Sequence, residues 1–188
     1  MKIAILASGS GSLAQAIIDA QKSGLLDLEI LALVSDRESQ AIARATHEGI
    51  PTKYLPMSEN RETWNTDLIK FLSGLNPNLV VSVGFMRVLS RDFVEKFPTI
   101  NTHPALLPNF PGAHGVRDAI SAGVRKTGAT VHWVDSGIDT GKVIVQKEVD
   151  VLPEDDETSL HERIKIVERA LIVETLRHFI ANGIPGRI

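Results

Sequence analysis

Residues 2–12 are Lys2-Ile3-Ala4-Ile5-Leu6-Ala7-Ser8-Gly9-Ser10-Gly11-Ser12, a short apolar run followed by a glycine-rich turn. A run this short and this apolar is typical of a strand that is buried on both faces, as in parallel sheets. A helical pattern follows from Leu13 to about Gln21. The order of strand, glycine turn and helix predicts the first unit of an α/β sheet, with a helix N-terminus beside the turn.

The same alternation continues through the first half of the chain. We expect further strands at 28–35, 52–55 and 79–83, and helices at 39–47 and 59–75. This pattern predicts a doubly wound, mostly parallel sheet of the α/β class. Because such sheets bind ligands beyond the carboxyl ends of their strands, we expect the functional site there.

The second half of the chain has a different pattern. Residues 130–134 and 142–151 largely alternate apolar and polar side chains, which predicts half-exposed strands and an antiparallel edge in the C-terminal half. The tetrad Ser159-Leu160-His161-Glu162 has the spacing of a capping box, so we expect a long helix that begins near Ser159 and ends at Asn182-Gly183. We find no internal repeat and expect one domain over residues 1–188.

Composition narrows the class of protein. The chain has 188 residues, a formal charge of -3 and no cysteine. The charge argues against a nucleic-acid partner, and the lack of cysteine excludes disulfides, thiolate zinc sites and cysteine nucleophiles. No apolar run reaches the ~18 to 20 residues of a membrane span, and the N-terminus lacks a signal-peptide pattern. We therefore expect a cytoplasmic protein with neither membrane nor nucleic-acid partners.

The turn Gly9-Ser10-Gly11-Ser12-Leu13-Ala14 has more than one interpretation. Free backbone NH groups at a helix N-terminus favour a phosphate site. The two glycines and Ala14 also fit a dinucleotide fingerprint, and Asp36 lies where a ribose-binding acid would be, so a nicotinamide enzyme is an alternative. A sharp turn without any ligand is a third, because glycine is favoured in such turns.

Three polar residues follow predicted strands and suit acyl transfer. Asn101 and His103 are two apart, so their side chains share one face of a short strand that Pro104 ends. Asp139 lies in a turn between Gly137 and Gly141. We expect its carboxylate to raise the pKa of the histidine and favour an imidazolium that stabilises an oxyanion. An ordinary buried histidine and an ordinary turn aspartate are the alternatives.

Two other constellations are less specific. His103, His114 and His132 include common zinc ligands, but their spacing fits no recognised pattern, so we expect no metal. Lys165 and Glu168 are one helical turn apart and could hold a phosphate and a ribose hydroxyl. A plain surface ion pair explains the same spacing.

Four motifs spread along nearly the whole chain suggest a family. They are the glycine turn, Gly84-Phe85-Met86-Arg87-Val88-Leu89-Ser90, Asn101-Thr102-His103-Pro104-Ala105-Leu106-Leu107-Pro108 and Asp139-Thr140-Gly141. With them the sequence resembles the phosphoribosylglycinamide formyltransferases, folate-dependent enzymes of purine synthesis with a Rossmann-like fold. The resemblance implies formyl transfer from 10-formyltetrahydrofolate to the amine of phosphoribosylglycinamide by direct attack through a tetrahedral intermediate. We also expect small-molecule substrates, no metal, and a monomer or homodimer.

The resemblance assigns roles to the three acyl-transfer residues. Asn101 would donate to the formyl oxygen, and His103 would act as acid and oxyanion partner. Asp139 would hold His103 charged and help to move the proton from the amine to the departing folate nitrogen.

The resemblance also implies two binding regions. The substrate phosphate and ribose would be bound by the backbone of the glycine turn and by two helical residues, namely Gly11, Ser12, Leu13, Lys165 and Glu168. The folate would be bound by an apolar segment and one arginine, namely Arg61, Met86, Arg87, Val88, Leu89 and Val94. Leu13 departs from the family, which often carries Asn there, so only its backbone NH can serve.

Several alternative functions stay open. A formyltetrahydrofolate hydrolase and a formyltransferase acting on charged transfer RNA would share the three residues, although the second needs a basic surface that this acidic chain lacks. A dehydrogenase would use the glycine turn and leave Asn101, His103 and Asp139 without a role. A non-catalytic binding module would need only the glycine turn.

Overall fold

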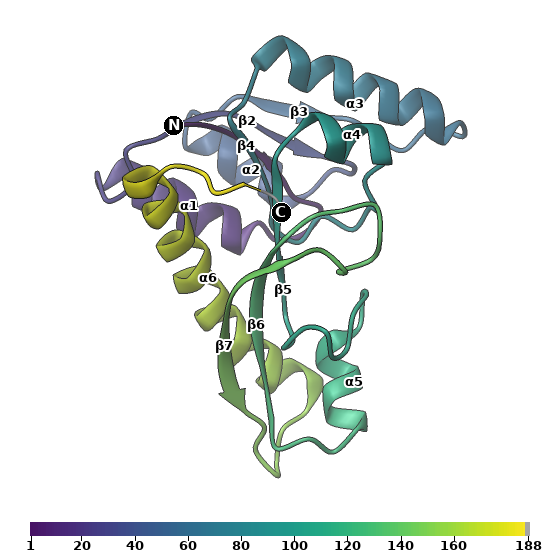
Figure 1. The fold of residues 1–188 in the computed structure, drawn as a ribbon, viewed down its shortest axis with the longest axis vertical. Coiled ribbons are helices and arrows are strands. Elements are labelled where there is room, and N and C mark those ends of the chain that lie inside the picture. The colour runs from purple at the N-terminus through teal and green to yellow at the C-terminus, as the bar shows by residue number, and fades with distance from the viewer. Residues whose placement is uncertain (187–188) are drawn as a thin grey trace.

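The computed structural model describes residues 1–186, which form one seven-stranded sheet with helices on both faces (Figure 1). The last two residues of the expected domain, 187 and 188, lie outside the described part. The strands are β1 (Lys2–Leu6), β2 (Glu29–Ser35), β3 (Thr52–Tyr54), β4 (Leu79–Ser82), β5 (Thr99–His103), β6 (Lys126–Trp133) and β7 (Val143–Asp150). Their order across the sheet is β3-β2-β1-β4-β5-β6-β7.

The first five strands are parallel, which confirms the doubly wound α/β prediction. β1 lies at the centre of these five strands, paired with β2 on one side and β4 on the other. The strand order therefore reverses between β1 and β4, where the connections leave the sheet in opposite directions. Ligands of doubly wound sheets bind at such a switch point, because the loops diverge and leave a crevice.

Helices cover the two faces of the sheet unequally. They are α1 (Ser12–Lys22), α2 (Gln40–His47), α3 (Arg61–Leu75), α4 (Arg91–Lys96), α5 (Gly115–Ser121) and α6 (Glu157–Asn182). Helices α1, α2 and α6 bury their apolar residues on one face, and α3 and α4 do so on the other (Figure 1). On α3 the predicted stripe is confirmed, since Trp64, Leu68 and Leu72 are all buried. No helix in the described range is long and apolar enough to cross a membrane.

The last two strands form the antiparallel part of the sheet, as predicted, but β6 is not half-exposed. β5 pairs with β6, and β6 pairs with β7, both antiparallel. Every residue of β6 after Lys126 is buried. The reason is that α6 packs on one face of β6, while the 105–108 segment covers the other, where Thr130 Oγ1 donates to the Ala105 carbonyl at 2.6 Å. Only β7 shows the expected exposure, because it is the end strand.

The capping box of α6 is real, but its first residue is Asp156 rather than Ser159. The Asp156 carboxylate accepts from the Ser159 backbone NH at 2.7 Å, and the Ser159 hydroxyl accepts from the Asp156 NH at 3.1 Å. Aspartate is as good an N-cap as serine, and the residue three positions on then closes the box. The helix therefore begins at Glu157 and ends, as predicted, at Asn182 before Gly183.

Gly128 in β6 offers a test of this packing. An added Cβ would lie 2.1 Å from the Lys147 carbonyl oxygen of β7 and 2.7 Å from Leu106 Cδ2. We expect Gly128→Ala to destabilise the protein by about 1–3 kcal/mol, as overpacking does. Gly74→Ala is the control, since nothing lies within 4 Å of the position in α3 and alanine favours helix. Thermal unfolding followed by circular dichroism should give a lower Tm for the first variant only, and equal Tm values would refute this account of β6.

Candidate active site

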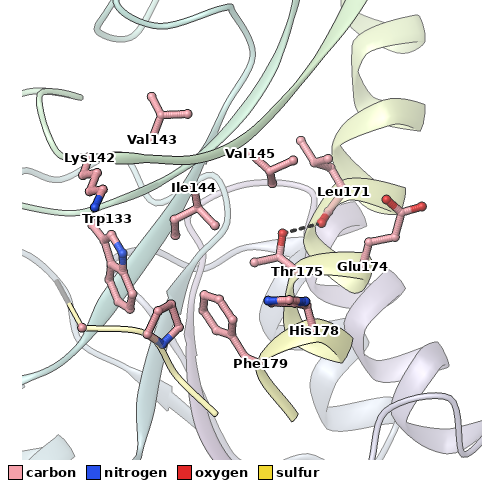
Figure 2. Close-up of a pocket in the computed structure, with 12 residues that line it drawn as sticks. Trp133, Lys142, Val143, Ile144, Val145, Leu171, Glu174, Thr175, His178 and Phe179 are labelled. Carbon is pink, nitrogen blue, oxygen red and sulfur yellow. Dashed lines mark hydrogen bonds between the residues drawn. The ribbon is translucent and has the colours of Figure 1, made fainter. Parts of the chain in front are cut away.

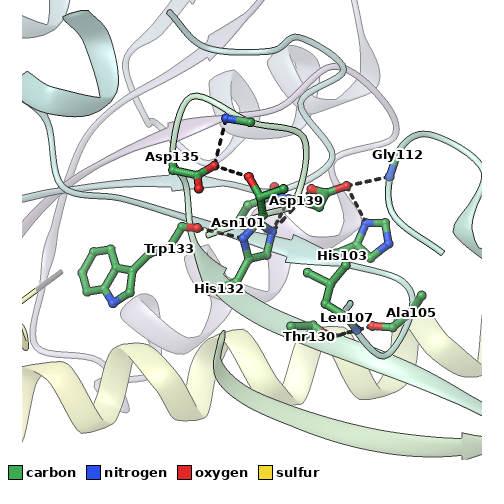
Figure 3. A network of polar contacts seen from close by, with 12 residues as sticks. Asn101, His103, Ala105, Leu107, Gly112, Thr130, His132, Trp133, Asp135 and Asp139 are labelled. Carbon is green, nitrogen blue, oxygen red and sulfur yellow. Dashed lines mark hydrogen bonds and ion pairs between the residues drawn. The ribbon is translucent and has the colours of Figure 1, made fainter. Parts of the chain in front are cut away.

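The structure brings Asn101, His103 and Asp139 together at the end of β5 (Figure 3). Asn101 and His103 lie on β5, where Asn101 stands opposite His132 of β6. Asp139 comes from the loop that joins β6 to β7. The Nδ1 atom of His103 lies 3.3 Å from Oδ2 of Asp139. The predicted meeting of an amide, an imidazole and a carboxylate is therefore present in the fold.

The loop that carries Asp139 is shaped by its own backbone. Asp139 adopts a φ of 54°, which a non-glycine residue rarely does. The Asp135 carboxylate accepts from the Gly137 NH at 2.9 Å and from the Thr140 hydroxyl at 2.7 Å. At Gly141 a Cβ would lie 1.7 Å from the Trp133 carbonyl oxygen, so only glycine fits. The tight loop points Asp139 back toward β5.

His132 belongs to the same cluster, although the sequence suggested it only as a weak metal ligand. Its Nδ1 lies 2.8 Å from the Trp133 carbonyl oxygen, and its Nε2 lies 3.2 Å from Nδ2 of Asn101. The carbonyl can only accept, so Nδ1 carries the proton and Nε2 accepts from the amide. The same Nε2 lies 3.5 Å from Oδ1 of Asp139. His132 thus links Asn101 to Asp139, a contact that depends on strand register and leaves no signal in the sequence.

The three histidines do not form a metal site. Among residues 1–186, no group of three or more His, Asp or Glu side chains is arranged to hold a metal ion. His114 lies at the N-cap of α5.

His103 is held by acceptors on both sides of its ring. Nε2 lies 2.7 Å from the Phe110 carbonyl oxygen, so Nε2 carries the proton in the neutral ring. Nδ1 then faces the Asp139 carboxylate, and a second proton would complete a hydrogen bond there. A Cβ on Gly115 would lie 3.1 Å from Nε2 and 2.9 Å from the Phe110 oxygen, so this arrangement also requires a small residue at position 115.

The expected rise in the pKa of His103 is wrong in its net direction. Burial lowers the pKa of His103, because its side chain is 4% exposed and charging it there loses hydration. Asp139 and the Phe110 carbonyl act in the opposite direction but do not outweigh burial. The resting imidazole is therefore neutral at neutral pH, and Asp139 limits the shift rather than reversing it.

Asp139 itself stays ionised. Burial raises its pKa, but the contact with the His132 ring, the hydrogen bond from the Gly112 NH and the charge interactions with the two imidazoles outweigh burial and lower the pKa. The Gly112 NH donates to Oδ2 at 2.8 Å. A fixed negative charge therefore lies beside Nδ1 of His103.

The glycine turn has the geometry of an anion site. Gly11 has a φ of 72° and stands at the N-cap of α1, where no side chain of the described residues caps the helix. The first NH groups of α1 are therefore open to a ligand. The side chain of Leu13 is buried in the core, so its departure from the family pattern leaves only its backbone at the turn. Arg44 of α2, which the sequence gave no reason to select, donates from Nε to the Ser10 carbonyl at 3.0 Å.

Lys165 and Glu168 do not pair with each other. The Lys165 ammonium lies 2.7 Å from Glu162 Oε1, so the plain ion pair forms with a different acid. Glu168 is 3% exposed, and burial raises its pKa to about 7, against the smaller effects of the Thr102 hydroxyl, Lys165 and Arg169.

The 84–90 loop leaves β4 at the switch point and has both exposed and buried apolar residues. Met86 and Val88 are exposed, while Leu89 and Val94 are buried with α3 and α4. Arg61 donates to the Val88 carbonyl at 2.5 Å, so its guanidinium lies on the loop. These expected cofactor-binding residues thus lie on one side of the switch point.

The position of Asp36 does not suit a ribose-binding acid of a dinucleotide-binding enzyme. Its side chain is fully buried, and Oδ2 lies 2.6 Å from Nε of Arg87. A ribose-binding acid must present its carboxylate to the crevice. The carboxylate of Asp36 is already engaged inside the protein, which removes the main support for the nicotinamide alternative.

A separate pocket of about 470 Å³ lies between α6 and the β6–β7 pair (Figure 2). Apolar residues such as Ile144, Leu171 and Phe179 line it. None of the residues expected from the sequence to act in catalysis or binding lines this pocket.

Comparisons with known proteins show the family of the chain. A family model described as formyl transferase matches residues 1–176. The chain belongs to the formyl transferase family. A phosphoribosylglycinamide formyltransferase of Mycobacterium tuberculosis is 43% identical over 187 residues, which are 97% of this chain and 86% of that protein.

Solved structures of formyl transferases have the same fold. The phosphoribosylglycinamide formyltransferase of Bacillus halodurans has a TM-score of 0.93 and 34% identity over 100% of both chains. Glycinamide ribonucleotide transformylase 1 of Symbiobacterium toebii has a TM-score of 0.94 and 33% identity, over 100% of this chain and 92% of that one. The resemblance found in the sequence motifs is confirmed.

The effect of Asp139 on His103 can be measured directly. Because the Asp139 carboxylate favours the imidazolium, we expect Asp139→Asn to lower the pKa of His103 further. An NMR titration of the imidazole protons would give both values, with Asp67→Asn, on the exposed face of α3, as the control. An unchanged or higher pKa in Asp139→Asn would mean that the two groups are not coupled.

Glu168 should make stability depend on pH. Its pKa is about 7 in the folded protein against 4.5 in the reference state, so the unfolded chain binds fewer protons between these values. The contribution of Glu168 to the free energy of unfolding should therefore fall as pH rises from about 4.5 to 7. Glu168→Gln should remove this fall, whereas Glu162→Gln, on the same helix, should keep it. Urea unfolding of the three proteins across this range tests the point, and parallel curves for Glu168→Gln and wild type would contradict it.

Proposed function

We propose that this chain transfers the formyl group of 10-formyltetrahydrofolate to the amine of phosphoribosylglycinamide in purine synthesis. The observation that carries the proposal is His103, held between the Phe110 carbonyl and Asp139 with Asn101 on the same strand face. The glycine turn and the 84–90 loop flank the same edge of the sheet, at the switch point. The amine substrate, with its phosphate, and the formyl donor would therefore occupy separate places at this edge of the sheet.

Asn101 and His103 are proposed to stabilise the developing oxyanion. Attack of the amine on the formyl carbon places a negative charge on the former carbonyl oxygen. An NH of the Asn101 amide and the positive charge of a protonated His103 would stabilise that oxygen, because both are held in place by the fold. No covalent bond to the protein is needed. The carbon–nitrogen bond to the amine forms first and gives the tetrahedral intermediate, and the bond to the folate nitrogen breaks when this intermediate collapses.

The lowered pKa of His103 fits a proton-transfer role. A neutral resting imidazole can accept the proton that the attacking amine loses. The Asp139 carboxylate and the nearby oxyanion then favour the imidazolium. His103 is therefore charged while the oxyanion is present. The proton finally passes to the folate nitrogen that leaves, which balances the reaction.

Substrate binding is proposed at the glycine turn. The phosphate would accept from the backbone NH groups of Gly11, Ser12 and Leu13, with Lys165 nearby, because a helix N-terminus favours anions. Glu168 would bind the ribose. The guanidinium of Arg44 adds positive charge beside the turn.

The formyl donor is proposed to lie on the 84–90 loop. The exposed side chains of Met86 and Val88 offer apolar contact for an aromatic ring system. Arg87 and Leu89 share the loop, Val94 lies in the apolar cluster below, and Arg61 would face the glutamate tail. In the resting structure Arg61 donates to the Val88 carbonyl, so binding of a carboxylate would have to compete with that contact.

We also propose that residues 1–188 form one formyltransferase domain, which acts in the cytoplasm on small molecules alone, as a monomer or homodimer. The single continuous sheet of the described residues supports one domain.

The test is to mix the purified protein with phosphoribosylglycinamide and 10-formyltetrahydrofolate and to follow the absorbance change of deformylation. We expect turnover only when the ribonucleotide is present. Deformylation without it would indicate a hydrolase instead, and no deformylation at all would reject the proposal.

His103→Ala and Asp139→Asn should each lower turnover about 100- to 1,000-fold, as the loss of one oxyanion donor or its support does. His47→Ala is the matched control, since His47 is an exposed histidine of α2. Steady-state kinetics with both substrates saturating gives the comparison. Near-full turnover in either site variant would exclude these residues from the chemistry.

A further inference from the structure

The Asp36–Arg87 ion pair lies under the 84–90 loop, at the switch point of the sheet. Asp36 follows β2 directly, and its side chain is fully buried. The Arg87 side chain is 32% exposed, and its Nε lies 2.6 Å from Oδ2 of Asp36. Arg37 makes a longer contact, 3.4 Å, to the same oxygen. Burial raises the pKa of Asp36, but Ser8, Arg37 and Arg87 outweigh burial and lower it, so the carboxylate is ionised.

Other contacts tie the same loop to the glycine turn. The Met86 NH donates to the Ser8 hydroxyl at 2.9 Å, and the Ser8 NH donates to the Gly84 carbonyl at 3.0 Å. Ser8 is the residue that precedes the turn, and its hydroxyl also lies beside Asp36. One buried polar cluster therefore joins the end of β1, the end of β2 and the loop after β4.

The far side of the loop is held differently. Arg61 is exposed and donates to the Val88 carbonyl at 2.5 Å, so a ligand carboxylate can compete for it. The Asp36 contact to Arg87 is shielded from solvent on the carboxylate side. Of these two arginine contacts, the one to Asp36 is the better able to keep the loop in place when a ligand binds.

We propose that Asp36 is a positioning residue that sets the 84–90 loop for the formyl donor by holding Arg87. The inference rests on the proposed function. Asp36 does not touch the donor. It fixes the arginine side chain beneath the loop, so that Met86 and Val88 present their apolar side chains to the crevice on either side of Arg87.

Stability alone does not account for a charge at this position. A buried ion pair contributes little net stability, because both groups lose hydration, and an apolar pair is often as stable or more so. The ion pair instead fixes the orientation of the Arg87 side chain. A charge-assisted hydrogen bond is about twice as strong as a neutral one, so it restricts the guanidinium to one position. The expected consequence is an effect on donor binding that exceeds the effect on folding.

The experiment compares Asp36→Asn with wild type in the transfer assay. The amide keeps the shape but loses the charge-assisted contact, so we expect KM for 10-formyltetrahydrofolate to rise about 5- to 20-fold. We expect kcat and KM for the ribonucleotide to stay within about twofold, because the catalytic residues are untouched. The Kd of tetrahydrofolate, measured by calorimetry without turnover, should rise by the same factor.

Arg37→Gln is the matched control, since Arg37 contacts the same carboxylate but lies outside the loop, and all parameters should stay within about twofold of wild type. Arg87→Met gives an independent variant. If the two residues act through each other, the double variant should weaken donor binding no more than the larger single change.

The outcomes separate the two proposals. Unchanged KM and Kd in Asp36→Asn, a fall in kcat alone, or additive effects in the double variant would overturn the positioning role while leaving the transferase assignment intact. A drop in Tm without a change in donor Kd would assign Asp36 to folding only and would also overturn it. Wild-type protein that neither turns over nor binds tetrahydrofolate would overturn the proposed function, and the positioning role with it.

Discussion

The antiparallel pairing of β5 with β6 is the constraint on which the candidate site depends. It places His132 opposite Asn101 and starts the Asp139 loop directly after β6, within reach of His103. A shift of one residue would turn Asn101 and His103 to the opposite face of the sheet, because strand side chains alternate. The burial of β6 on both faces, by α6 and by the 105–108 segment, holds that register in place.

The switch point between β1 and β4 organises the other half of the site. Two loops diverge there, one rich in glycine and the other bearing exposed apolar side chains. The topology of the sheet therefore separates the glycine-rich loop, which suits an anion, from the loop with exposed apolar side chains. Ser8 joins the two loops, because its NH donates to the Gly84 carbonyl and its hydroxyl accepts from the Met86 NH.

The fold was largely predictable because its signals are local. Apolar runs such as residues 2–7, and helical stripes such as that of Trp64, Leu68 and Leu72, identify strands and helices without knowledge of the rest of the chain. The burial of β6 and the place of Ser159 within its capping box were predicted wrongly. The burial of β6 depends on segments remote in sequence, and Asp156 offers a second N-cap three residues earlier.

The proximity of Asn101, His103 and Asp139 was predictable from the sequence, but their electrostatics were not. The residue types of Asn101, His103 and Asp139, and their positions at or after the ends of predicted strands, indicated that they could meet. The role of His132, the contact of Arg44 with the turn and the lowered pKa of His103 all follow from register and depth of burial. These quantities exist only in the folded chain, so single-sequence patterns carry little information about them.

The position of β7 at the end of the sheet has a consequence for how copies of the protein meet. An end strand leaves backbone groups unpaired, and flat apolar end strands can join across molecules. On β7 the exposed positions include Lys147, Glu148 and Asp150, and Glu148 lies 2.5 Å from the Lys126 ammonium. Bringing a second copy of this strand alongside would strip water from those charges. The charged side chains of β7 therefore disfavour pairing of this end strand with the same strand of another molecule.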